Sequence, residues 1–140
     1  MSSEHKFIEH TADIAFDVTA DSIEELFLES ARAWRISVVG DAAGKSPSTV
    51  SIKLEASSLE ELLVTFLNEI NFLLLTKNWL SVIYDNLKID KEKFNLRVII
   101  SGFYLDKSVE IKEEIKSVTY HQMDIVKKDN KFSTRVVFDI

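Results

Sequence analysis

The chain has 140 residues, of which 46% are hydrophobic and 29% charged, a balance typical of a single globular domain spanning residues 1–140. It contains no cysteine, which excludes disulfide bonds, thiolate metal sites and a cysteine nucleophile. The net charge of −6, from 17 basic and 23 acidic residues, argues against tight direct binding of nucleic acid.

The N-terminal residues show neither the basic start nor the apolar run of a secretory signal.

Residues 9–13 follow, with four polar side chains in five positions at the head of an alternating segment. One interpretation is a surface turn in which Thr11 or Asp13 bonds to local amides. The other is a functional site at the start of the strand.

A strand-then-helix unit occurs twice in the first half of the chain. Residues 14–20 alternate between apolar and polar side chains, and residues 50–56 do the same, as expected for strands with one buried face. Each segment is followed by a serine and, three positions later, a glutamate, the pattern of a helix capping box. The two pairs are Ser22 with Glu25 and Ser58 with Glu61.

The two predicted helices differ in their apolar surfaces. The first, over residues 23–38, has a single apolar stripe suited to packing on a sheet. The second, over residues 59–76, is apolar around more of its circumference, which predicts a central helix or one with an apolar strip open to a partner. Its most apolar part, residues 62–75, is too short and too polar to span a bilayer. We therefore expect a cytoplasmic protein with no membrane partner.

Between the two strand–helix units, residues 40–49 are expected to form a loop. The second half of the chain is rich in predicted strands. Residues 102–115 show only a weak pattern. Together the elements predict an α+β fold, a two-layer sandwich of two helices packed on a mixed, mostly antiparallel sheet, with the internal strand–helix repeat. The predicted strands cover residues 82–89, 94–100, 118–126 and 132–138, with polar turns at 90–93 and 128–131.

Phosphate-binding loops, zinc-protease motifs and serine-hydrolase elbows are all absent from the sequence. The last predicted strand stops abruptly at Asp139, one residue before Ile140. If this strand reaches Asp13, the carboxylates supply the hard oxygen ligands that Mg²⁺ and Ca²⁺ prefer. The alternative is a frayed terminus.

Residues 116–121 form a further candidate segment. Alternation places Val118 and Tyr120 on one face of a strand and Thr119 and His121 on the other. His121 is then either a solvated strand residue or, together with Lys116, a group that faces a ligand or partner.

Taken together, these segments resemble the archease family, and the resemblance runs in order from residue 7 to residue 140. The matching segments are Phe7-x-Glu9-His10-Thr11-Ala12-Asp13, residues 22–27, 58–63, 67–69 and 116–121, and the final Asp139-Ile140. The chain departs from the family pattern at Gly102 and Phe103 and in the loop after them, so residues 106–114 receive no role.

The resemblance implies a cofactor protein rather than an enzyme. Archeases activate the RtcB-type tRNA-splicing RNA ligase by promoting its guanylylation and multiple turnover. The implied metal ligands are Asp13, Asp139 and Ile140, with His10 and Lys116 as accessory residues. The ion is divalent, and the resemblance does not distinguish between Ca²⁺, Mg²⁺ and Mn²⁺. The alternative role is a general chaperone or modulator of tRNA-modifying enzymes such as a tRNA methyltransferase.

A third hypothesis is a small metal-dependent hydrolase. Its weakness is that the sequence shows no positioned general base besides His10 and His121. For the ligase activator, an acidic protein carrying a carboxylate-held cation would enter the basic active site of the ligase and stabilise charge there.

Overall fold

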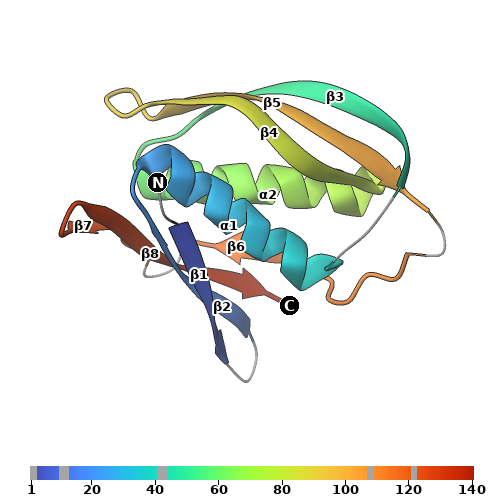
Figure 1. The fold of residues 1–140 in the computed structure, drawn as a ribbon, viewed down its shortest axis with the longest axis horizontal. Coiled ribbons are helices and arrows are strands. Elements are labelled where there is room, and N and C mark those ends of the chain that lie inside the picture. The colour runs from blue at the N-terminus through green and yellow to red at the C-terminus, as the bar shows by residue number, and fades with distance from the viewer. Residues whose placement is uncertain (1–2, 10–12, 41–43, 107–108, 121–122) are drawn as a thin grey trace.

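Two helices lie between two antiparallel β-sheets in the computed structural model, which describes residues 3–9, 13–40, 44–106, 109–120 and 123–140 (Figure 1). In chain order the elements are β1 (Ser3–Glu9), β2 (Asp13–Ala20), α1 (Ile23–Val38), β3 (Gly44–Glu55), α2 (Leu59–Lys77), β4 (Trp79–Asp90), β5 (Asn95–Leu105), β6 (Ser117–Thr119), β7 (Val126–Lys128) and β8 (Lys131–Asp139).

The strands divide into two sheets, here called sheet A and sheet B. Sheet A has the order β1-β2-β8-β6, with β7 also pairing with β8, and sheet B has the order β3-β5-β4. The predicted α+β class is confirmed. The structure differs from the expected single mixed sheet because every strand pair among the described residues is antiparallel and the helices are covered on both sides. The broad apolar circumference of α2 requires this second cover.

Both helices begin where the repeated serines predict. The Ser22 side chain accepts a hydrogen bond from the Glu25 amide at 3.1 Å, and Ser58 accepts one from the Glu61 amide at 3.1 Å. Each bond satisfies an amide that the first helical turn leaves without a partner. Neither α1 nor α2, the helices of the described part of the chain, is long and apolar enough to cross a membrane.

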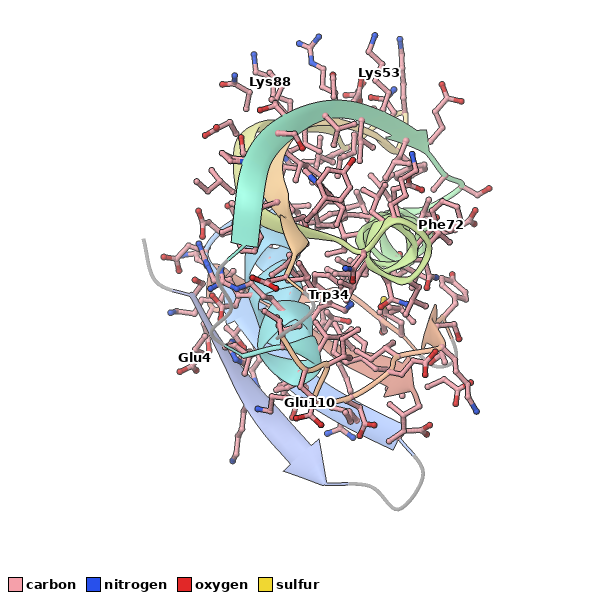
Figure 2. All side chains as sticks on the ribbon, turned by 90° about the vertical axis from the view of Figure 1, so that its right-hand side faces the viewer. Glu4, Trp34, Lys53, Phe72, Lys88 and Glu110 are labelled. Atoms are coloured by element: carbon pink, nitrogen blue, oxygen red, sulfur yellow. The ribbon has the colours of Figure 1, made fainter. Side chains whose placement is uncertain are left out.

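The core fills the space between the helices and the inner faces of both sheets. Trp34 of α1 is fully buried at the centre (Figure 2), and its indole NH donates to the Asn71 side chain of α2 at 2.9 Å. The rings of Phe27 and Phe66 lie 5.9 Å apart across the two helices. Phe138 of β8 extends the same core to sheet A.

Several predicted boundaries were wrong. β3 already begins at Gly44, inside the expected loop, because Pro47 sits where the pairing with β5 shifts register and so removes no ladder bond. The predicted strand over residues 118–126 is two short strands, β6 and β7, which both pair with β8. β1 was not predicted as a strand.

Candidate functional site

Asp13 and Asp139 lie directly opposite each other on β2 and β8. Opposite residues of an antiparallel pair point to the same face, with Cβ atoms about 5 Å apart. This face is the outer one, because their neighbours Ile14 and Phe138 pack against the core. The predicted adjacency of the strand at Asp13 and the last strand is therefore confirmed, although this strand is the second in the chain and not the first.

A third strand extends this arrangement. Ser117 of β6 is the register partner of Asp139 on its other side, and the neighbouring Lys116 amide donates to the Asp139 carbonyl at 2.8 Å. Asp13, Asp139 and Ser117 thus form a row across three strands, here called the carboxylate row. Its side chains offer two carboxylates and one hydroxyl. Sequence reasoning noted the segment around Ser117 but gave this residue no role, because only the register identifies it.

Among the residues that the structure describes, the carboxylate row lacks a paired counter-charge, since neither Asp13 nor Asp139 forms an ion pair there. By contrast, Asp17 on the same face forms an ion pair with Arg135, whose guanidinium donates a hydrogen bond to the Asp17 carboxylate at 2.8 Å. Like charges placed directly opposite destabilise a sheet, so a bound cation would relieve the repulsion between the two carboxylates.

The donors in the carboxylate row fit a hard divalent ion, which takes carboxylate, carbonyl and water oxygens. The side chains alone are insufficient, since the described residues contain no group of three or more histidines, cysteines, aspartates and glutamates that could hold a metal. A complete shell therefore needs further oxygens, such as the Ser117 hydroxyl, the Ile140 carboxylate or water.

The other predicted site residues have mixed outcomes. Ile140 directly follows Asp139, and its half-buried side chain packs against the core. The Lys116 side chain is exposed beside Ser117. His10 and His121 lie outside the described residues. Tyr120, expected to share a face with Val118, follows the end of β6 and is 52% exposed, whereas Val118 is buried.

Two asparagines of α2 hold the third strand in place. The Asn68 side chain donates to the Val118 carbonyl at 3.1 Å and accepts from the Val118 amide at 2.8 Å. Asn71 donates to the Ile115 carbonyl at 2.7 Å. In the sequence these residues only interrupt an apolar helix, but their spacing of three places them on one helical face. They fix residues 115–118 and, through the pairing with β8, the Asp139 end of the carboxylate row.

A second acidic group, Glu29 of α1, is fully partnered and serves as an internal comparison. It is 6% exposed and bonds to His5 of β1, to the Ser3 hydroxyl at 3.1 Å and to Arg32 at 2.7 Å. Burial raises the pKa of Glu29, but the hydrogen bonds from His5, Arg32 and Ser3 outweigh burial and lower the pKa below its ordinary value. This carboxylate therefore needs no added cation.

Comparison with known proteins gives a consistent result. Residues 5–140 match the Archease protein family (MTH1598/TM1083). The protein named "Protein archease" from Methanopyrus kandleri is 33% identical over 135 residues, covering 95% of this chain and 96% of that protein.

Two solved structures share the fold. The solution structure of Methanobacterium thermoautotrophicum protein 1598 has a TM-score of 0.72 and 26% identity, covering 97% of this chain and 98% of that one. The crystal structure of a Thermotoga maritima protein, described as an archease and possible chaperone, has a TM-score of 0.64 and 29% identity, with 96% of both chains covered.

Proposed function

Because the chain belongs to the archease family, we propose that it is a cofactor protein of an RtcB-type RNA ligase and not an enzyme itself. In this role it promotes guanylylation of the ligase and multiple turnover in tRNA splicing, using a divalent ion held by Asp13 and Asp139. The observation that carries the proposal is the cross-strand pairing of these two aspartates on an outer sheet face, without a counter-charge among the described residues.

The chain's own residues have distinct roles in this proposal. Asp13 and Asp139 hold the ion, and the Ile140 carboxylate completes the ligand set. Asn68 keeps Ser117 and the backbone of residue 116 paired with Asp139, which limits the movement of its carboxylate. The exposed side chain of Lys116 lies next to Ser117 and faces the ligase. A divalent ion bound there supplies positive charge for phosphate groups in the ligase active site.

The direct test adds the protein in substoichiometric amounts to a cognate ligase and measures covalent GMP loading and ligation turnover. The wild type accelerates both, whereas Asp13→Asn and Asp139→Asn lose the acceleration. Asp17→Asn is the matched control, because Asp17 lies on the same face but pairs with Arg135. Equal activity of the wild type and Asp139→Asn would exclude a role for the carboxylate row.

A second candidate function, a general chaperone or modulator of enzymes such as a tRNA methyltransferase, has its own structural support. Phe72 and Leu75 of α2 are 52% and 41% exposed, although both are large and apolar. Figure 2 shows Phe72 directed away from the core on the uncovered side of α2. Phe72 and Leu75 are three residues apart and therefore lie about one turn apart on the same face of the helix. Adjacent exposed apolar side chains are typical of protein contact surfaces.

The chaperone function predicts a different dependence. Replacing Phe72 and Leu75 with serine should abolish protection of an aggregating client enzyme, measured by light scattering, and leave ion binding unchanged. Ile83 and Ile99 of sheet B, which are 54% and 38% exposed, provide a matched control pair. Protection that persists in the Phe72/Leu75 variant would contradict this function.

A further inference from the structure

Three basic residues lie side by side across sheet B. Arg97 of the central strand β5 has Lys53 of β3 as its register partner on one side and Lys88 of β4 on the other. All three side chains are exposed on the outer face, and Figure 2 shows Lys53 and Lys88 extending away from the sheet. These residues are here called the cation row.

A backbone irregularity brings Lys88 into the row. The pairing of β4 with β5 shifts register between Asp85 and Lys88, and Asn86 in this interval has a φ of 55°. An extra residue in a strand reverses the alternation beyond it. Without this bulge, Lys88 would lie on the opposite face from Asp85 and would point toward the helices.

No member of the cation row forms an ion pair within the described residues, although Glu55 and Asp90 line a hollow at one side of the row together with the three cations. The nearby Asp90 carboxylate instead accepts hydrogen bonds from the amides of residues 92 and 93, both at 3.0 Å. On the side away from Asp90, a hollow of about 400 Å³ contains all three cations. Its described lining residues include no carboxylate: they are Ser51, Lys53, Asn86, Lys88, Arg97, Val98 and Ile99.

Like charges directly opposite one another cost stability in a sheet, and this row occurs in a chain with a net charge of −6. We propose that the cation row and its hollow form a binding site for a linear run of phosphate groups, supplied by a polyphosphate or by an RNA backbone. This site is separate from the carboxylate row and does not depend on the proposed function.

The geometry favours a chain of phosphates over a single compact anion. The row crosses three strands, and neighbouring strands are about 4.8 Å apart, so the outer cations are separated by about two strand spacings. Arg97 offers a planar guanidinium at the centre, while the lysines supply point charges on flexible stems. The Ser51 hydroxyl and the Asn86 amide add neutral donors beside them. Three contacts alone give weak, salt-sensitive binding, which is compatible with the expectation that this acidic chain does not bind nucleic acid tightly.

The test measures fluorescence anisotropy of a labelled single-stranded RNA oligonucleotide at low salt, with inorganic triphosphate as competitor. The wild type should bind with a dissociation constant of about 10⁻⁴ to 10⁻⁶ M and lose about twentyfold in affinity when salt is raised fourfold. Replacing Lys53, Lys88 and Arg97 with alanine should reduce affinity at least tenfold, whereas Arg97→Lys alone should retain most of it. The control replaces the exposed Lys77, Lys112 and Lys128, which gives the same change in net charge.

The outcomes separate the sources of phosphate. Displacement of RNA by triphosphate supports a site for any phosphate chain, and RNA binding that triphosphate does not displace supports the RNA backbone. Three outcomes overturn the proposal: no binding of either probe at low salt, equal loss in the two triple variants, or equal displacement by polyglutamate. Circular dichroism of both triple variants establishes that each remains folded.

Discussion

The outer faces of the two sheets carry cross-strand charges of opposite sign. In sheet A, Asp13 lies opposite Asp139, and in sheet B, Arg97 lies between Lys53 and Lys88. Asp17 and Arg135 show the usual arrangement, in which a register pair of opposite charge forms its own ion pair. The comparison shows that charge in register is neutralised by an ion pair at one position, whereas at the two others the described residues form no ion pair.

The largest expected effect is that of a divalent ion on the carboxylate row. A ligand present at a hundredfold excess over its dissociation constant stabilises the folded state by about 2.7 kcal/mol. Titration with Ca²⁺, Mg²⁺ and Mn²⁺, followed by thermal melting, should show this increase for the wild type and for Asp17→Asn. Asp13→Asn should lose it but melt no lower than the wild type without metal, because the repulsion between two carboxylates is removed. A melting temperature indifferent to every ion would remove the metal site.

The buried carboxylate of Glu29, which has hydrogen-bond partners, is the counterpart of the carboxylates of the carboxylate row, which form no ion pair among the described residues. Glu29→Gln should destabilise the protein by about 2 kcal/mol at neutral pH, because hydrogen bonds to a buried charge are lost. Glu24→Gln, which breaks only a surface pair with Lys91, serves as the control and should cost much less.

The difference in stability between the wild type and Glu29→Gln has a defined pH dependence. Because the folded-state pKa of Glu29 lies below its ordinary value of 4.5, its contribution is fully present above that value and is lost as pH falls through the lowered pKa. Denaturant unfolding at a series of acidic pH values should therefore show the wild type and Glu29→Gln converging in stability. A constant difference down to low pH would contradict this assignment.

Asn68 tests how far the carboxylate row depends on its support. Asn68→Ala removes two hydrogen bonds to Val118 and should cost about 1–2 kcal/mol of unfolding free energy. Affinity for the divalent ion should also fall at temperatures where the variant is fully folded. Asn95→Ala is the comparison variant, since Asn95 lies on sheet B. If calorimetry gives the same ion affinity for Asn68→Ala as for the wild type, the row does not need this support.

The smallest expected effect belongs to the cation row. Replacing Lys53 and Lys88 with glutamine, while keeping Arg97, should raise the unfolding free energy by a few tenths of a kcal/mol, because like charges in register are removed. Replacing Lys77 and Lys112 in the same way should leave stability unchanged or lower it. Denaturant midpoints measured at low salt would reveal the difference, which should disappear at high salt. A loss of stability in the first variant would show that the lysines are internally compensated.

Local sequence signals predicted the parts of the fold that depend on local physics. Ser22 and Ser58 marked both helix starts, because a serine cap and its glutamate lie within one turn. The polar interruptions of the sequence pattern pointed to Asp13 and Asp139, the family resemblance made them a pair, and the register brings these two residues together. Whether they bind a metal stays a prediction.

The features that escaped prediction depend on non-local pairing. The strand predicted over residues 118–126 is interrupted after Thr119, and β6 keeps only the three residues that β8 and Asn68 flank, a break that the alternation does not reveal. In an uninterrupted strand, Lys88 would lie on the opposite face from Asp85. Only the bulge at Asn86 places the Lys88 side chain on the outer face. Periodicity assumes an uninterrupted strand, and it fails wherever the backbone inserts a residue.

The two bonds between Asn68 and Val118 have a consequence for assembly. Every second residue of an antiparallel edge strand turns its amide and carbonyl outward, where another chain can add a strand. In β6 this residue is Val118, and the Asn68 amide occupies both of its backbone groups as a neighbouring strand would. Strand addition at this edge is therefore blocked. A partner that approaches Asp139 from this edge therefore meets side chains and not the free backbone groups of Val118.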